Sequence, residues 1–124
     1  MARSRQDRQL AWRRGRLGES LAILSLACRG YRILARGHRS PAGEIDIVAR
    51  RGRLLVFVEV KARDSLAGAA EALLARQRRR IARAAAGYLA SRPELAHCQP
   101  RFDVILVAPW RWPLHIVNAW RLES

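Results

Sequence analysis

Cysteine is scarce in this sequence. Its 124 residues include only Cys28 and Cys98, which lie far apart and belong to no Cys-x-x-Cys or Cys/His spacing. Structural zinc sites and disulfide frameworks depend on such spacings, so the sequence gives little support for either. Two isolated cysteines fit a reducing compartment, and we expect a cytoplasmic protein.

Long hydrophobic runs are also lacking. The stretch LAILSLAC at residues 21–28 falls well short of the roughly 20 residues that a membrane-spanning helix needs. It follows a basic segment, as the core of a secretory leader does, but Glu19 precedes it and Ser25 stands where a lipoprotein signal has Leu or Val. We therefore expect a soluble protein with no membrane partner.

Acidic residues are few. The chain has 10 Asp and Glu against 24 Lys and Arg, which gives a formal net charge of +14. Nearly all of the basic residues are arginines, whose guanidinium groups bind phosphate through paired hydrogen bonds and stay charged at any working pH. A GC-rich genome explains Arg in place of Lys, but it does not explain the excess of base over acid. The charge favours nucleic acid as the partner.

Aromatic residues are few as well, with 4 Trp, 2 Tyr and 2 Phe, whereas Ala, Leu, Val and Ile are abundant. This composition suits helices packed on a sheet, and the length suits one domain over residues 1–124 with flexible residues 1–8. The hydrophobic periodicity predicts an α/β fold with a central mixed sheet of about five strands flanked by helices. The expected helices are residues 9–29 and 69–91, and the expected strands are 31–36, 44–50, 54–62, 101–108 and 114–120.

One of these strands carries charges where a buried strand should have none. The segment FVEVKAR places Glu59 and Lys61 on the same side of the strand as Phe57, because side chains alternate. A two-residue turn at Arg51-Gly52 would pair Asp46 with Phe57 and make Asp46 a diagonal neighbour of Glu59. The sequence therefore predicts two acids and a lysine in one cluster.

Carboxylates that gather on a covered face repel one another and need a counter-charge. A divalent cation such as Mg²⁺ binds one or two carboxylates together with waters and phosphate oxygens. With the basic character of the chain, such a site predicts phosphodiester hydrolysis, in which Lys61 orients a water or stabilises developing charge. The alternative is a structural ion network in which Lys61 neutralises Glu59.

These residues carry a family resemblance. GEID at residues 43–46 followed by the Glu59-Val60-Lys61 segment is similar to the PD-(D/E)xK nuclease signature. In more detail, the chain resembles the YraN-like family of proposed endonucleases, which are related in fold to archaeal Holliday junction resolvases. The matching segments are Gly18-Glu19, GEIDIVAR, VFVEVKAR, Ala85-x-x-Tyr88-Leu89, RFDVI and Asn118-Ala119-Trp120, which together span about residues 15–120.

The resemblance implies a restriction-endonuclease-like core and a metal-dependent nuclease. It implies Glu19, Asp46 and Glu59 as ligands of Mg²⁺ or Mn²⁺ and Lys61 as the catalytic base or stabiliser. Junction-cutting relatives act as dimers, so the resemblance also suggests a homodimer. The chain departs from the family pattern at two positions, with Gly37 in place of the usual Asn and Gln77 in place of a usual Lys.

Several basic or polar residues are candidates for contacting DNA, which we favour over RNA. An arginine stripe recurs at helical spacing in the second helix, although a solvated face has the same pattern. The candidate contacts are Arg39, Arg63, Arg76, Gln77, Arg80 and Arg83. We interpret Asp103 as structural support rather than as a metal ligand.

Aromatic and histidine residues outside this set are open to two interpretations. Trp110, Trp112 and Trp120 could stack on unpaired bases or lie at the rim of the core. The three histidines lack metal-ligand spacing, so we expect them to be structural or exposed.

Three hypotheses follow for the function. The first is a metal-dependent endonuclease that hydrolyses DNA, branched or single-stranded DNA included. The second is a binding module with the same fold that does not cleave, and the third is a basic accessory protein of a nucleoprotein assembly.

Overall fold

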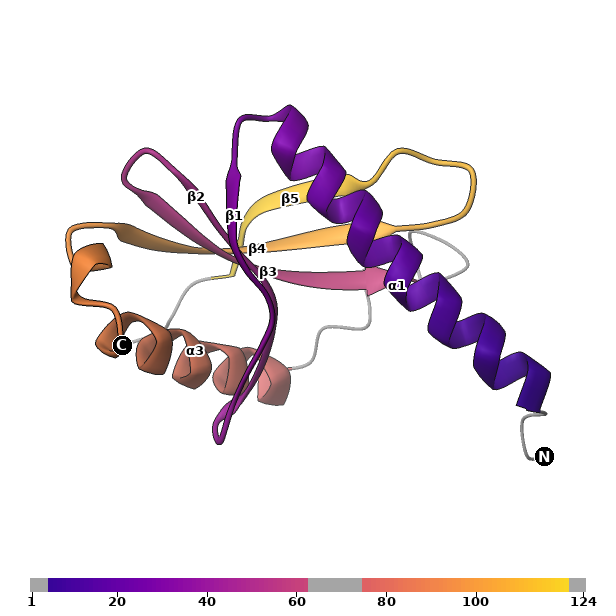
Figure 1. Ribbon diagram of the computed structural model, residues 1–124, viewed down its shortest axis with the longest axis horizontal. Helices are drawn as coiled ribbons and strands as arrows, with labels where there is room; N and C mark the ends of the chain where they lie inside the picture. The colour runs from indigo at the N-terminus through magenta and orange to yellow at the C-terminus, as the bar shows by residue number, and fades with distance from the viewer. Residues whose placement is uncertain (1–4, 63–74, 121–124) are drawn as a thin grey trace.

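The computed structural model describes the backbone of residues 5–62 and 75–120 and the side chains of residues 17–62 and 78–119 (Figure 1). Its elements follow the order helix, three strands, helix, two strands. They are α1 (Arg5–Cys28), β1 (Arg32–Ser40), β2 (Gly43–Arg51), β3 (Leu54–Ala62), α3 (Ala75–Ala90), the short 3₁₀ helix η1 (Pro93–Leu95), β4 (Gln99–Val107) and β5 (Leu114–Trp120). The expected residues 69–74 of the second helix lie outside the described residues.

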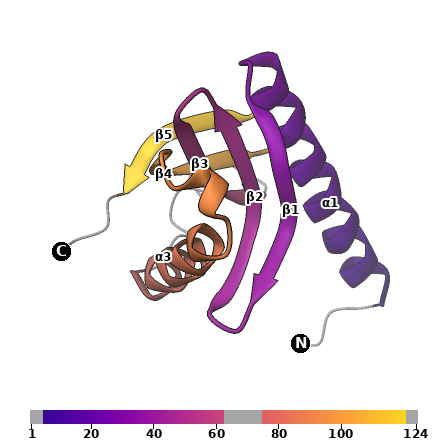
Figure 2. The same ribbon diagram turned by 60° about the vertical axis from the view of Figure 1, so that its left-hand side comes forward.

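The five strands form one sheet in the order β1-β2-β3-β4-β5. Strands β3 and β4 are parallel, and the other neighbouring pairs are antiparallel, so the sheet is mixed. Figure 2 shows α1 and α3 on opposite faces of this sheet. The predicted α/β fold is confirmed, and it is consistent with a restriction-endonuclease-like core.

The first hairpin differs from the sequence prediction. Residues 37–43 were expected to form a loop, but β1 continues to Ser40 and β2 begins at Gly43, which leaves only Pro41 and Ala42 as the turn. The glycines that suggest a loop instead let strand pairing continue, since Gly37 has a φ of 61° and Gly43 a φ of 152°. The prediction of a loop was wrong because the glycines shape a hairpin.

Each face of the sheet packs against one helix. On the α3 side the core includes Phe57, Tyr88 and Phe102, and on the α1 side it includes Leu26 and Val58. Both faces of β3 are therefore covered, as its nearly continuous apolar sequence predicts.

In the described part of α1, the buried side consists of small side chains and Leu26. The helical spacing of Leu17, Leu21, Leu24 and Cys28 in the sequence predicts an apolar seam, but 63% of Leu17 and 49% of Leu24 are exposed. The buried residues are instead Ala22, Ser25 and Leu26. A Cβ added at Gly18 would lie 3.1 Å from the Cβ of Ala62, so this glycine lets α1 approach the end of β3 closely.

Within the described residues, no helix combines the length and apolarity needed to cross a membrane. Cys28 and Cys98 are both free thiols.

Candidate functional site

The candidate site lies where β2 and β3 separate. Their last paired residues are Ile47 and Val58. Before that point β2 pairs only with β1, where Ile45 lies opposite His38. After it, β3 continues beside β4, where Glu59 lies opposite Val104. The next residues on the two diverging strands are Asp46 and Glu59. The point where the strands separate, the β2–β3 fork, therefore brings these two carboxyl groups together.

The register of this hairpin differs from the predicted one by two residues. Val48, not Asp46, lies opposite Phe57, because the turn residues are Gly52 and Arg53 rather than Arg51 and Gly52. A shift of two residues keeps every side chain on its predicted face, whereas a shift of one would reverse it. The acid cluster therefore survives the error, and Asp46 moves from a diagonal position to one directly across the fork from Glu59.

Asp46 also has a structural role at the fork. Its Oδ2 accepts a hydrogen bond of 2.8 Å from the backbone N–H of Val60. The divergence of β2 takes away the strand that this N–H would otherwise pair with, and a buried N–H without a partner is costly. Asp46 thus replaces a backbone acceptor where the sheet opens.

The two carboxyl groups are held in an unfavourable electrostatic environment. Burial and then the negative charge of Glu59 raise the pKa of Asp46 from its ordinary 3.8 to about 7, against the lowering effect of the Val60 hydrogen bond. Burial also raises the pKa of Glu59, although the Lys61 charge and hydrogen bonds from Lys61 and Asp46 oppose the rise. The positive charge of Lys61 therefore does not fully offset the cost of ionising the two carboxyl groups at the fork.

Lys61 supplies the nearest positive charge. Its Nζ lies 3.2 Å from Glu59 Oε1, and only 8% of the residue is exposed. Lys61 is also the sole lysine in a chain whose other 23 basic residues are arginines. An ammonium group, unlike a planar guanidinium, is a compact point charge with three hydrogen-bond donors. The ion pair shows that Glu59 and Lys61 share one face, as predicted, and it is the contact that the alternative of a structural ion network expects.

Glu19 reaches the site less directly than the resemblance implies. Its Oε1 accepts a hydrogen bond of 3.1 Å from Arg36 Nε, and Arg36 also donates to the Ser20 hydroxyl at 3.2 Å. Glu19 is nevertheless close enough for its charge to raise the pKa of Asp46. The sequence did not indicate a role for Arg36, because a single arginine among 23 does not stand out.

The donor set can be compared with what a divalent cation requires. Within the described residues, no group of three or more His, Cys, Asp and Glu side chains converges as a metal site. Asp46 and Glu59 do fit the chemistry of Mg²⁺, which binds one or two carboxylates and keeps several waters. Two partly buried carboxyl groups with raised pKa values also need added positive charge. The set of three carboxylate ligands stays a prediction.

Comparison with known proteins shows the family to which this chain belongs. The family described as "Uncharacterised protein family UPF0102" matches residues 18–107, which include Glu19, Asp46, Glu59 and Lys61. The chain belongs to the UPF0102 family. This is the YraN-like family that its motifs resemble.

The UPF0102 relatives match nearly the whole chain. A UPF0102 protein of Paramagnetospirillum magneticum is 57% identical over 119 residues, which cover 93% of this chain and 92% of that protein. One from Parvibaculum lavamentivorans is 55% identical over 111 residues, with coverage of 90% and 84%. A third, from Methylocella silvestris, is 49% identical over 121 residues and covers 98% of both chains.

One departure from the family pattern has a structural explanation in this UPF0102 protein. Gly37 has a φ of 61°, which is the left-handed conformation that glycine and asparagine adopt more readily than other residues. A change between Asn and Gly therefore keeps the backbone of β1. The second departure, Gln77, lies in α3, but its side chain is outside the described residues.

The predicted DNA contacts are only partly described. Arg39 is exposed and lies 3.8 Å from Glu44, and Arg80 and Arg83 are exposed on α3. A Cβ added at Gly43 would lie 3.5 Å from the Cβ of Arg80, so α3 meets the β1–β2 hairpin three residues from Asp46. Arg63 and the side chains of Arg76 and Gln77 lie outside the described residues.

Asp103 is structural, as predicted. It is 1% exposed and accepts hydrogen bonds from Arg101 Nε at 2.9 Å and from the Asn118 N–H at 2.9 Å, while its Oδ2 lies 2.6 Å from His115 Nε2. Burial alone would raise the pKa of Asp103, but the hydrogen bonds from His115 and Arg101 hold it below its ordinary value. The network ties β4 to β5.

His38 is also accounted for by packing. Its ring lies edge-on to the buried Tyr88, with the two ring centroids 5.0 Å apart.

Proposed function

We propose that this UPF0102 protein is a metal-dependent endonuclease that hydrolyses DNA phosphodiester bonds at the β2–β3 fork. The ligands of Mg²⁺ or Mn²⁺ would be Asp46 and Glu59, with Glu19 as a third carboxylate after it leaves Arg36. The observation that carries the proposal is the pair of partly buried carboxyl groups with raised pKa values beside Lys61. Groups with perturbed pKa values concentrate at functional sites.

Each residue of the fork would have its own role in the proposed hydrolysis. A divalent cation, when bound, polarises the scissile phosphate and lowers the pKa of an attacking water. Asp46 would hold β3 at the fork through the Val60 N–H while its other oxygen faces the reaction. Lys61, held 3.2 Å from Glu59, would orient the water or stabilise the negative charge that develops on the phosphate.

Two tryptophans support unpaired or branched DNA as the substrate. Trp110 is fully exposed at 101%, has a φ of 62° that bulky residues rarely adopt, and precedes Trp112, which is 55% exposed. Both lie in the turn after β4, and β4 runs parallel to β3 with Leu106 opposite Lys61. The turn is therefore at the same end of the sheet as the fork, where bases without partners could stack on its rings.

A binding module without catalysis is the second candidate. The structural roles of the same groups favour it, because Asp46 satisfies the Val60 N–H and Lys61 neutralises Glu59 without any metal. A basic accessory protein of a nucleoprotein assembly is the remaining alternative.

A cleavage assay separates these functions. The protein is incubated with duplex, single-stranded and four-way DNA in Mg²⁺, in Mn²⁺ and in EDTA. We expect metal-dependent products that are lost in Asp46→Asn and in Lys61→Met, but kept in Glu94→Gln, a matched change of an exposed acid in η1. Asn in place of Asp46 keeps an oxygen that can accept from Val60, so this variant tests chemistry rather than folding.

The other outcomes are equally informative. Binding without cleavage in any metal would favour the module, and its affinity should then fall steeply with salt. No binding of DNA or RNA at low salt would leave the accessory protein. If Trp110 and Trp112 stack on bases, their joint change to Ala should weaken single-stranded binding about tenfold and duplex binding much less.

A further inference from the structure

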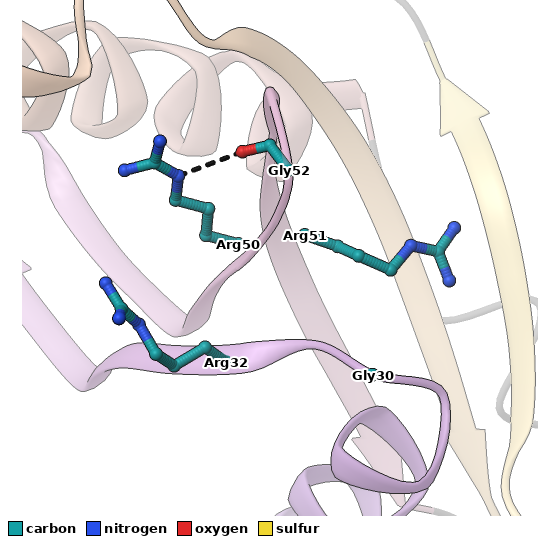
Figure 3. Close-up of a pocket in the computed structure, with 5 residues that line it drawn as sticks. All are labelled: Gly30, Arg32, Arg50, Arg51 and Gly52. Atoms are coloured by element: carbon teal, nitrogen blue, oxygen red, sulfur yellow. Dashed lines mark hydrogen bonds between the residues drawn. The ribbon is translucent and has the colours of Figure 1, made fainter.

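A concave region lies at the far end of the β2–β3 hairpin from the fork. It is a hollow of about 430 Å³ lined by Gly30, Arg32, Arg50, Arg51 and Gly52 (Figure 3). Its lining is made only of arginines and glycines. A Cβ added at Gly52 would meet nothing within 4 Å, so the hairpin turn leaves this region open.

Two of the arginines face each other across strands. Arg32 of β1 pairs directly with Arg50 of β2. Figure 3 shows both side chains extending to the same side of these strands, whereas Arg51 extends to the other side. Like charges directly opposite one another in a sheet are destabilising. An anion held between the two guanidinium groups would relieve this repulsion.

Groups that carry no negative charge hold the arginines of the hairpin in place. Arg50 donates from Nε to the Gly52 carbonyl at 3.0 Å, and its Nη2 lies 3.2 Å from His97 Nε2. Arg51 donates to the Arg29 carbonyl at 3.1 Å and lies over the Tyr31 ring, 4.3 Å from its centroid. These partners orient the guanidinium groups without cancelling their charge.

No carboxylate in the described part of the chain pairs with these arginines. The arginine ion pairs formed there are Arg36 with Glu19, Arg39 with Glu44 and Arg101 with Asp103. The hollow therefore combines oriented guanidinium groups, open glycine backbone and charge that described acids leave uncompensated. This combination is suited to a phosphate group, which guanidinium groups bind bidentately.

We propose that Arg32 and Arg50 bind a backbone phosphate of nucleic acid outside the cleavage site. The nature of the polyanion rests on the proposed function, but the phosphate site itself does not. Arg50 lies four residues after Asp46 on β2, which corresponds to roughly 13 Å along the strand. The bound strand would thus contact the sheet at both ends of β2, and the hollow would fix its position relative to the fork.

Equilibrium binding tests the proposal without any cleavage. A fluorescein-labelled 20-base-pair duplex is titrated in EDTA at several salt concentrations with wild type and with Arg32→Gln/Arg50→Gln. The control is Arg79→Gln/Arg92→Gln, which removes the same charge elsewhere, and thermal melts verify that both variants fold. We expect the Arg32/Arg50 variant to bind about tenfold more weakly than the control, with the slope of log K against log salt reduced by about 1.

Equal losses in the two double variants would overturn the proposal, because bulk charge alone would then explain the binding. A second measurement uses only folded wild type. Inorganic phosphate is titrated while the Nε–H signals of Arg32, Arg50, Arg79 and Arg92 are followed by NMR. Saturable shifts of Arg32 and Arg50 alone would support the site, and parallel unsaturated shifts of all four would overturn it.

The two proposals fail separately. Loss of DNA cleavage with the phosphate response retained would reject the nuclease and keep the hollow. DNA cleavage with no effect of the Arg32 and Arg50 substitutions on binding would keep the nuclease and reject the phosphate site in the hollow.

Discussion

At the scale of single residues, Asp46 has two opposed roles. Its hydrogen bond to the Val60 N–H stabilises the fork, while burial and Glu59 oppose its ionisation. The first role explains why an acceptor stands here, but an amide or hydroxyl would serve equally well. The fold does not require a carboxylate at position 46. The ionisable group of Asp46 is therefore a better indication of function than its hydrogen bond is.

The raised pKa of Asp46 predicts how stability depends on pH. The folded protein keeps a proton on Asp46 up to about pH 7, whereas the unfolded chain loses it near 3.8. Without metal, the free energy of unfolding should therefore fall as pH rises from about 4 to about 7. The contribution is at most about 4 kcal/mol, since one pKa unit corresponds to about 1.4 kcal/mol.

Urea unfolding of wild type and Asp46→Asn between pH 4 and pH 8 measures this contribution. The free energy of unfolding of the variant should decline much less over this pH range, because Asn does not titrate. Identical pH profiles would contradict the raised pKa of Asp46 at the fork.

Lys61 should matter to stability through Glu59. Lys61→Met leaves the Glu59 carboxylate without its partner, and at pH 8 we expect a loss of about 3 kcal/mol. Glu59→Gln/Lys61→Met should recover most of it, because neither charge is left alone. Chemical denaturation of the two single variants and the double variant gives the coupling energy, and additive effects would mean that the ion pair is not formed.

At the scale of elements, two helical glycines serve as a matched pair. Gly87 lies on the exposed side of α3, and a Cβ there meets nothing within 4 Å, whereas at Gly18 it would lie 3.1 Å from the Cβ of Ala62. Gly87→Ala should stabilise the protein by up to about 1 kcal/mol through helix propensity. Gly18→Ala should give no such gain, because Ala62 is fixed on β3 and α1 must move away.

Thermal melts of both variants test this packing. Equal stabilisation by the two changes would contradict the close approach of α1 to β3.

The sequence predicts the element order well and the details of pairing less well. Strand β3 is recognisable because it is long, apolar and flanked by turn residues. The hairpin register was wrong because Arg-Arg-Gly-Arg permits a turn with glycine in either central position. The exposed leucines of α1 show why its packing could not be predicted, since the close approach of small residues depends on the strand beneath them.

The candidate site was partly predictable for a physical reason. Glu59 and Lys61 interrupt an apolar strand, and such breaks of a local rule mark functional or strained positions. Arg36 and the Arg32–Arg50 pair carried no such signal, because they belong to a chain in which arginine is common. Their roles depend on the β1–β2 register, which only the fold defines.

At the scale of the whole molecule, a chain with a formal charge of +14 contains a site that is locally acidic. Long-range attraction should bring nucleic acid to the basic surface, and the fork should bind the cation that DNA alone would not hold in place. A homodimer, which the resemblance suggests, would provide two such forks for the two strands of a duplex or junction. Analytical ultracentrifugation with and without four-way DNA should show two protomers per junction.

The most direct test of the central claim is a Mn²⁺ titration followed by electron paramagnetic resonance at pH 8. Wild type and Glu94→Gln should bind Mn²⁺ at a saturable site, and Asp46→Asn/Glu59→Gln should lose that site. Equal Mn²⁺ binding by all three proteins, or saturable binding by none of them with or without DNA, would contradict a metal centre at the β2–β3 fork.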